Sequence, residues 1–245
     1  MTRINHLKDV RGDLHAHTDA TDGHDSLEMM ALAAANKGYE YLAITDHSKH
    51  LTVAHGLDKK RLWQQIKAID RLNKKLTKIT VLKSIEVDIL EDGSLDLSND
   101  ILKELDLTVC SVHYKFNLSP KKQTERILRA MDNPYFNILA HPTGRLINRR
   151  EPYEVNLERI LQGAKERGCF LEINAQPERL DLADVNCRLA KDMGVKLSIA
   201  TDAHSTKQFD YMLFGIDQAR RGWLEKDDVL NTHSLSQLKK LLKRQ

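Results

Sequence analysis

Short apolar stretches alternate with longer amphipathic segments along the whole chain. The apolar stretches are rich in β-branched residues and cover residues 10–17, 41–46, 80–89, 107–113, 136–141, 169–174 and 195–201. Runs of this length and composition are typical of buried strands. Because segments with helical spacing lie between them, the pattern predicts strand–helix units in series.

Capping residues predict where the intervening helices begin and end. Ser26 is a suitable N-cap for a helix over residues 27–37, with Gly38 just past its end. Asp58 can cap a long basic helix that runs to about Leu76, and Ser119-Pro120 predicts another start. Further helices are expected over 154–167, 184–192, 206–221 and 236–242. The connection 90–105 has the weakest pattern and should be helical in part.

Seven strand–helix units in series predict a parallel α/β fold, because parallel strands need crossover connections. The chain lacks the glycine fingerprint of dinucleotide-binding sheets, so a closed or nearly closed barrel is favoured. An open doubly wound sheet is the alternative. No linker rich in Pro, Gly or Ser interrupts the 245 residues, and residues 1–245 are therefore interpreted as a single domain.

Composition excludes several classes of protein without selecting one. With 38 basic and 35 acidic residues the net charge is only +3, which neither demands nor forbids an anionic substrate. No apolar run approaches the ~20 residues of a membrane span, and the first residues have no apolar signal core. The 3 cysteines lack paired spacing, which favours a reducing, cytoplasmic location.

Histidine and acidic residues stand at or near the end of six of the seven predicted strands. The sequences are DLHAHT, TDH, SIEVD, SVH, AHP and ATDAH. The carboxyl ends of parallel barrel strands meet at one face, where catalytic groups gather. His15 and His17, two apart on a strand, point to the same side, as do Asp202 and His204. Imidazole and carboxylate groups without thiolates indicate a zinc, manganese or iron site that is open to water.

Each of these residues also has an ordinary structural explanation. A single histidine at a strand end, such as His113 or His141, is usually a hydrogen-bonded structural residue, and Glu86 could pair with a cation. The metal interpretation is preferred because so many strand ends share the pattern. Such a cluster would be costly to bury without cations. Three further histidines lie in loops expected on the same face, where they could touch a substrate without binding metal: His24, His50 and His55.

Taken together, DLHAHT, TDG at residues 21–23, TDH, IEVDI, SVH, AHPTG and TDAH resemble the polymerase and histidinol phosphatase (PHP) superfamily of metal-dependent phosphoesterases. RGDLHAHT, LEINA and YMLFGIDQARRGWLEKDDVLNT are also similar to the PHP domain in the C-terminal part of bacterial-type family X DNA polymerases. The resemblance covers nearly the whole chain. It implies a distorted TIM-like (β/α)7 barrel with a metal site at the C-terminal face of the strands.

The resemblance also implies a centre of three divalent metal ions (zinc, manganese or iron), held by nine side chains in three groups. These groups are His15, His17 and Asp202; Glu86, His113 and His141, with Glu86 shared with the first group; and Asp22, His47 and His204. Glu86, Asp202 and His204 are the residues expected to serve catalysis. A hydroxide that bridges two metals is the expected nucleophile.

Asp13 and Asp46 have two interpretations. Either they orient ligating imidazoles, or they form ordinary hydrogen bonds at strand ends and turns.

The implied substrates are phosphate esters. Similarity to the polymerase-associated group implies a 3′–5′ exonuclease or other processing of DNA 3′ ends, and a histidinol-phosphatase type of phosphomonoesterase is the alternative. Four basic residues on the same face are expected to contact phosphates: Lys115, Arg145, Arg149 and Arg150. The basic helix from residue 59 to 78 is usually only a solvated surface, although it could also meet nucleic acid.

Partners follow from the same resemblance. The polymerase domains of the family X enzymes are not in this sequence, so a polymerase partner in trans is conceivable, and no membrane contact is expected. An amidohydrolase is less favoured, because it would need an eighth unit and a modified lysine. A non-catalytic metal scaffold is also less favoured, because no ligand position has been lost.

Overall fold

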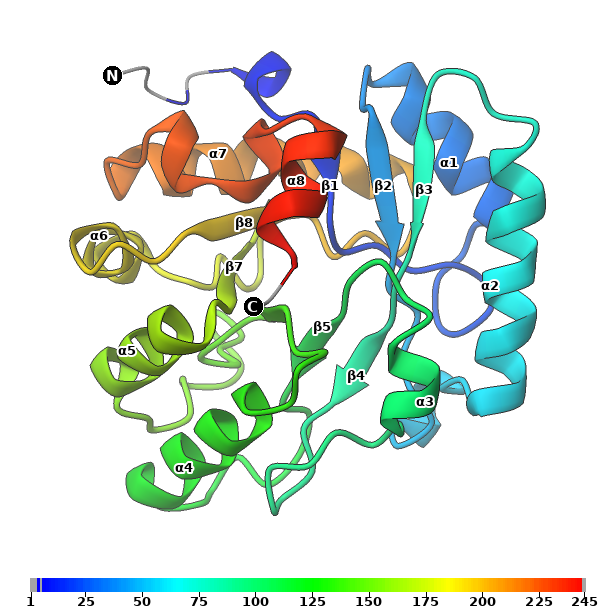
Figure 1. Cartoon of the computed structure of the whole chain (residues 1–245). Coiled ribbons are helices and arrows are strands. Elements are labelled where there is room, and N and C mark those ends of the chain that lie inside the picture. Colours follow the sequence, from blue (N-terminus) through cyan, green and yellow to red (C-terminus); the bar gives the residue numbers. More distant parts are fainter. Residues whose placement is uncertain (1–3, 5, 244–245) are drawn as a thin grey trace.

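The protein is an α/β structure with parallel strands, seen in a computed structural model that describes residue 4 and residues 6–243 (Figure 1). The strands are β1 Gly12–Asp13, β2 Tyr41–Ile44, β3 Thr80–Lys83, β4 Glu86–Asp88, β5 Val109–Ser111, β6 Ile138–Leu139, β7 Phe170–Asn174 and β8 Leu197–Ala200. They pair in chain order as two sheets, β1-β2-β3 and β4-β5-β6-β7-β8, and every ladder is parallel.

The third predicted strand is divided between the two sheets. β3 pairs with β2, whereas β4 pairs with β5, and residues 84–85 separate them. Isolated parallel bridges connect the sheets at both sides, between His47 and Glu86 and between Ala16 and Ala203. The strands therefore follow one another around a ring, and the ends of the first and last strands are neighbours. This closure matches the predicted distorted barrel and not an open sheet.

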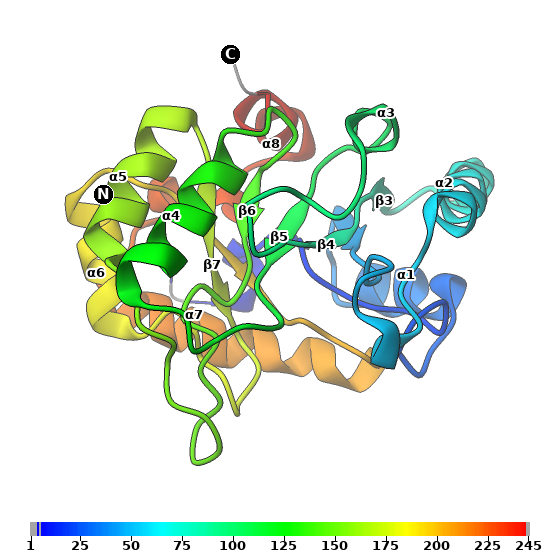
Figure 2. The same cartoon turned by 90° about the horizontal axis from the view of Figure 1, so that it is seen from below.

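Helices surround the strands (Figure 2). They are α1 Leu27–Asn36, α2 Lys59–Asn73, α3 Asn99–Leu102, α4 Pro120–Met131, α5 Leu157–Arg167, α6 Asp184–Asp192, α7 Met212–Arg221 and α8 Leu235–Leu241. The helix expected over 206–221 begins as a 3-10 segment, Thr206–Tyr211, before it becomes α7. α2 ends at Asn73, before the predicted Leu76, and α5 begins at Leu157 instead of residue 154.

The predicted caps are confirmed in atomic detail. The side chain of Ser26 accepts a hydrogen bond from Met29 N, and that of Asp58 accepts one from Arg61 N. Each bond satisfies a backbone donor that would otherwise lack a partner in the first turn. Among the described residues, no helix is both long and apolar enough to cross a membrane. The 3 cysteines are buried and form no disulfide.

Apolar side chains fill one end of the strand ring. Tyr41, Val109, Phe170 and Leu238 belong to a buried cluster inside the strands, so α8 packs against that end. A second, larger cluster lies between the strands and the outer helices. Along β7, side chains two apart share a face, so the polar residues that follow Phe170 on the same face enter the interior. The interior therefore changes from apolar to polar along the strands.

Candidate metal centre

The nine candidate ligands gather around Glu86. Its Oε1 lies 3.2 Å from His113 Nε2 and 3.0 Å from His141 Nε2, and its Oε2 lies 3.3 Å from His15 Nε2 and 3.0 Å from His47 Nδ1. These four histidines follow β1, β2, β5 and β6 in the chain. A carboxylate that faces two imidazole nitrogens with each oxygen is well placed to be shared between neighbouring cations.

The remaining members complete the cluster. Asp202 Oδ1 lies 3.0 Å from His17 Nε2 and 3.5 Å from His15 Nε2. Asp22 Oδ2 lies 3.3 Å from His47 Nε2 and 3.4 Å from His204 Nε2. The structure therefore brings together residues that are far apart in the chain, since His17 and Asp202 are separated by 185 positions.

Three groups have ligand atoms that all lie within 4.8 Å of one another. They are His15, His17 and Asp202; His17, Asp22, His47 and His204; and His47, Glu86 and His113. The first group is the same as the expected one. The second contains the three expected residues, Asp22, His47 and His204, together with His17. The third differs, because His47 replaces His141, although His141 Nε2 lies 3.0 Å from Oε1 of the same carboxylate.

Two members of the cluster have an uncommon backbone conformation. His141 has a φ of 27° and Asp202 a φ of 51°, in the left-handed region that side chains other than glycine disfavour. Such strain persists only where the surroundings impose it, and it concentrates at functional sites. Here His141 lies in the turn after β6 and Asp202 in the turn after β8, and these turns direct both side chains into the cluster.

Burial and charge shift the pKa values of the cluster in opposite directions. Burial would raise the pKa of Glu86, but the imidazoles of His47, His15 and His113 outweigh it and hold that pKa well below its usual range. Burial and the nearby His204 and His47 lower the pKa of His17 to about 3.

In contrast, the pKa of His113 rises to about 10 because the carboxylates of Glu86 and Asp88 outweigh its burial. The pKa of His204 rises to about 9, because its hydrogen bond to Asp22 and the charge of Asp202 likewise outweigh burial. In the metal-free protein, protons on some imidazoles therefore compensate the buried carboxylates.

The donor atoms fit divalent cations. His15 Nε2, His17 Nδ1 and His47 Nδ1 are buried and have no hydrogen-bond partner in the described part of the chain. A buried polar atom without a partner is costly, and its presence calls for a ligand. Neutral imidazole and carboxylate donors suit zinc, manganese and iron, and none of the three groups contains a cysteine.

Acidic residues outside the cluster hold two of its rings. Asp88 Oδ1 lies 2.5 Å from His113 Nδ1, and Glu172 Oε1 lies 2.7 Å from His15 Nδ1. Contacts of this kind fix the tautomer of a ligating imidazole. The sequence analysis assigned no such role to either residue. The available signal was the i, i+2 spacing of Asp88 from Glu86, and the position of Glu172 in a strand whose one other polar residue is Asn174.

The hydrogen bonds of Asp13 and Asp46 support the second interpretation of these residues, ordinary bonding at strand ends and turns. Asp13 accepts hydrogen bonds from the backbone N of His15 and from Thr201, and Asp46 accepts from Thr18, Thr21 and Gln65. Both carboxylates therefore hold strand ends and turns together. Asp13 joins the ends of β1 and β8 where the ring closes, and burial raises its pKa to about 6.

Comparison with known proteins identifies the family. Residues 13–176 match the family model described as the PHP domain. This chain belongs to the PHP family. It is 44% identical over 97% of its length to the DNA polymerase/3′-5′ exonuclease PolX of Bacillus subtilis, but it spans only 42% of that relative. It is also 31% identical, over 94% of both chains, to a Thermoanaerobacter protein named "probable phosphatase".

Solved structures show the same fold. A histidinol phosphate phosphatase from Lactococcus lactis, in complex with zinc, L-histidinol and phosphate, has a TM-score of 0.61 and 16% identity. The match covers 86% of this chain and 93% of that one. A protein assigned as a histidinol phosphatase from Listeria monocytogenes has a TM-score of 0.66 and 17% identity. That match covers 80% of this chain and 96% of the Listeria chain.

The four basic residues expected to contact phosphate differ in their availability in this PHP structure. Arg145 donates from Nε to the carbonyl of Arg179 at 2.6 Å and from Nη2 to that of Leu180, so it joins two loops. Arg150 donates to Gly144 O at 2.8 Å and lies over the ring of Phe116. These bonds engage both guanidinium groups within the protein.

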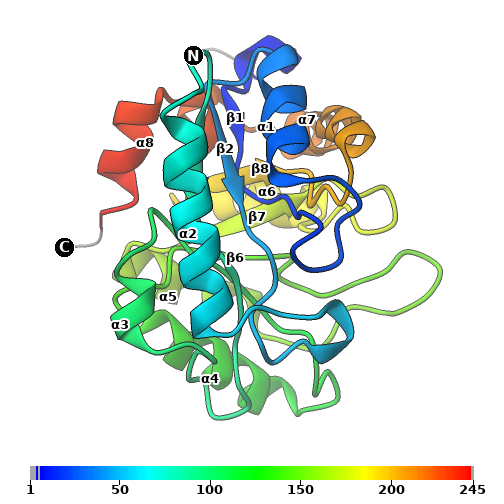
Figure 3. The same cartoon turned by 90° about the vertical axis from the view of Figure 1, so that its right-hand side faces the viewer.

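Lys115 and Arg149 remain accessible at the surface. Their side chains are 54% and 71% exposed, and each is opposite an exposed acid, Glu91 at 3.8 Å and Glu178 at 3.0 Å. Exposed ion pairs of this kind are weak and exchange readily. Arg149 lies in the loop between β6 and α5, which stands out from the body of the protein (Figure 3).

Arg179 is a cationic residue that the sequence analysis did not select. Its Nε lies 3.7 Å from Asp202 Oδ2, and its side chain is only 19% exposed. Its Nη1 is buried without a hydrogen-bond partner among the described residues. The guanidinium therefore has an unused donor at the edge of the cluster, suited to an anionic oxygen.

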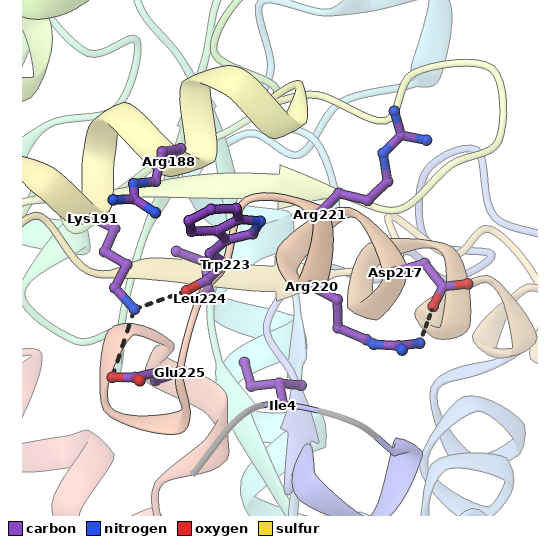
Figure 4. Close-up of a pocket in the computed structure, with 9 residues that line it drawn as sticks. All are labelled: Ile4, Arg188, Lys191, Asp217, Arg220, Arg221, Trp223, Leu224 and Glu225. Atoms are coloured by element: carbon purple, nitrogen blue, oxygen red, sulfur yellow. Dashed lines mark hydrogen bonds and ion pairs between the residues drawn. The ribbon is translucent and has the colours of Figure 1, made fainter. Parts of the chain in front are cut away.

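A cavity of the PHP structure lies away from the histidine cluster. It measures about 820 Å³ between α6, α7 and Trp223, and none of the nine candidate ligands lines it (Figure 4). Each basic side chain in it has an acidic partner, in the pairs Arg188–Asp192, Lys191–Asp228, Arg220–Asp217 and Arg221–Asp184. This cavity therefore has little positive charge to spare for a phosphate, and the histidine cluster is the better candidate site.

Proposed function

We propose that this PHP protein, a metal-dependent phosphoesterase, hydrolyses phosphate esters at the 3′ ends of DNA. The observation that carries the proposal is the buried cluster of six histidines and three carboxylates around Glu86, with ligand atoms close enough to share cations. The greater identity to the polymerase and exonuclease relative, 44% against 31% for the phosphatase-named one, favours DNA as the substrate. We interpret residues 1–245 as one catalytic domain, with a polymerase as a candidate partner in trans.

The nine cluster residues would hold up to three divalent cations in the groups given above. When bound, such ions polarise phosphate oxygens and lower the pKa of water. We assign Glu86, Asp202 and His204 to catalysis. Glu86 faces four imidazoles of the cluster, Asp202 faces His15 and His17, and His204 Nε2 lies 3.4 Å from Asp22 Oδ2. Asp88 and Glu172 orient the rings of His113 and His15, so that their opposite nitrogens face Glu86.

Other residues of the same face bind the substrate in this proposal. Arg179 directs a buried donor toward the phosphate beside Asp202. Lys115 and Arg149 contact the backbone phosphates further along the strand, because their side chains are exposed and lie in loops that leave cluster strands. Arg145 and Arg150 hold the loops that carry these contacts.

The decisive experiment compares three substrates with the purified protein in the presence of Mn²⁺ or Zn²⁺. They are a 5′-labelled single-stranded oligonucleotide, the same oligonucleotide with a 3′-phosphate, and histidinol phosphate. We expect hydrolysis of one or both DNA substrates, and its loss in Asp202→Asn. His6→Ala serves as the control, since His6 is exposed before β1 and belongs to none of the metal-binding groups. Turnover of histidinol phosphate without any attack on DNA would contradict the proposal.

A further inference from the structure

Two aromatic rings lie beside the cluster without belonging to it. His50 is three residues beyond His47, and Tyr114 directly follows His113. The centroids of the His47 and His113 rings are 5.2 Å apart, and those of the His50 and Tyr114 rings are 4.5 Å apart with a tilt of 42°. Two neighbouring loops thus each carry one cluster histidine and, shortly beyond it, one further ring. We call these two further rings, His50 and Tyr114, the outer pair.

The outer pair is held in place from within the protein. Arg126 of α4 is fully buried, donates to the carbonyl of Tyr114 at 3.0 Å, and places its guanidinium carbon 4.8 Å from the centre of the Tyr114 ring. Asp96, which is also buried, accepts a hydrogen bond from His50 N at 2.9 Å. The positions of both loops are therefore fixed before any substrate binds.

His50 lies at the surface of the protein. His50 is exposed, and in the described part of the chain the only ring packed against it is that of Tyr114. The nearby Phe116 differs, because its ring is engaged by two other side chains. Its ring centre lies 5.8 Å from that of Tyr153, on which it stacks, and 4.2 Å from the guanidinium carbon of Arg150. Of these two aromatic pairs, the one that contains His50 is the better suited to receive a planar ligand.

We propose that His50, supported by Tyr114, forms a stacking platform for a nucleobase at the 3′ end of the DNA strand. This inference rests on the proposed function and specifies how the same site recognises its substrate. A base is linked through its sugar to the phosphate that the cluster would bind, so it must lie near the rim of the cluster. Stacking on an aromatic side chain accepts every base, because each has a π face, and this suits an enzyme that shortens DNA of any sequence.

The test uses two oligonucleotides of the same sequence, labelled at the 5′ end. In one, the last two nucleotides carry thymine, and in the other these two nucleotides are abasic. We expect the wild-type protein to hydrolyse the thymine substrate with a kcat/KM about tenfold higher, the order expected for one lost stacking contact. His50→Ala should reduce this ratio to about one, and His50→Phe should restore it. His6→Ala, which changes an exposed histidine before β1, should leave the ratio at its wild-type value.

Each outcome decides the question. A ratio that stays near tenfold in His50→Ala would overturn the platform, as would a wild-type ratio of one. Loss of thermal stability in His50→Ala without a change in the ratio would show a structural role for the ring and would also overturn it. If the wild-type protein hydrolyses p-nitrophenyl phosphate but neither oligonucleotide, the proposed function fails, and the platform fails with it.

Discussion

Glu172 holds His15 in the orientation that its place in the cluster requires. Glu172 Oε1 lies 2.7 Å from His15 Nδ1, and both residues are fully buried. The other oxygen, Oε2, accepts a hydrogen bond from the backbone N of His141 at 2.7 Å. One carboxylate from β7 thus fixes a ring near β1 and the strained turn after β6. Neither His15 nor His141 could shift without breaking a buried, charge-assisted hydrogen bond.

Glu172→Gln should weaken metal binding while the protein remains folded. The amide keeps the size of the side chain but loses the charge that raises the basicity of His15, and changes at such outer positions typically cost 10- to 100-fold in metal affinity. Competition with a chelator of known affinity measures this loss. Glu158→Gln, an exposed acid on α5, is the matched control. Equal metal affinity in the two variants would show that Glu172 does not support the site.

Gly23→Ala should disturb one of the three groups selectively. A methyl group at Gly23 would lie 2.7 Å from the backbone carbonyl of Thr18, which cannot move as a flexible side chain could. The loop that carries Asp22 must then shift away from His47 and His204. We expect the loss of about one metal ion per chain, counted by elemental analysis after reconstitution, and destabilisation of about 1–3 kcal/mol.

Gly163→Ala provides a control for Gly23→Ala. A methyl group there would meet the side chain of Leu128 at 2.2 Å, away from the cluster. This variant should therefore lose stability but bind as many ions as the wild type. If both variants bound the same number of ions, the assignment of Asp22 to a metal group would be wrong.

The metal-free protein should lose stability as the pH rises from about 6.5 to 10. The pKa of His113 is raised to about 10 and that of His204 to about 9, mainly by carboxylates that outweigh burial. A histidine with a raised pKa stabilises the fold below its unfolded value near 6.5, and this contribution is lost as the pH passes the folded value. Metal ions need neutral imidazoles, so metal affinity should increase over the same range.

Thermal unfolding between pH 6 and 10, with and without a chelator, measures this effect. The melting temperature of the chelated protein should fall toward high pH, and the difference between loaded and chelated protein should widen. A chelated protein that becomes more stable across this interval would contradict the account of its electrostatics.

Arg149→Ala should weaken binding to single-stranded DNA in a salt-dependent manner. Its side chain is 71% exposed, so its removal leaves the fold intact, and one lost phosphate contact should reduce the slope of log K against log salt by about 0.7. Fluorescence anisotropy with a labelled oligonucleotide at several salt concentrations gives this slope. Arg159→Ala, an exposed cation on α5, should not change it. An unchanged slope in Arg149→Ala would remove Arg149 from the substrate contacts.

The sequence predicted the ring of strands and the convergence of histidine and acidic residues from six strand ends, because both follow from local pattern. The complete set of nine, with Asp22 in a loop, followed only from the resemblance to the PHP family. Parallel strands bring their carboxyl ends together, so His15, Glu86 and His204 could be placed at one face without coordinates. The break between β3 and β4 was not predictable, because neither Ser84 nor Ile85 is a Gly or Pro that would mark an interruption of the strand. Glu172 was not expected in the site because it lies inside β7, two residues before the end of the strand.

The sequence also could not show which cations are available to a substrate. Arg145 and Arg149 look equivalent in the chain, but the first is bound to carbonyls of a loop more than 30 residues away, whereas the second is exposed. Such long-range backbone partners leave no trace in local spacing. Arg179 was overlooked for the same reason, because its importance comes from its closeness to Asp202 in the fold.

The central claim is that the cluster around Glu86 binds divalent cations, and anomalous diffraction from crystals grown with Mn²⁺ or Zn²⁺ tests it most directly. The account predicts up to three anomalous peaks, each about 2.0–2.2 Å from imidazole nitrogens and carboxylate oxygens of the nine residues. A map with no peak inside the cluster, from crystals whose protein hydrolyses phosphate esters, would contradict it.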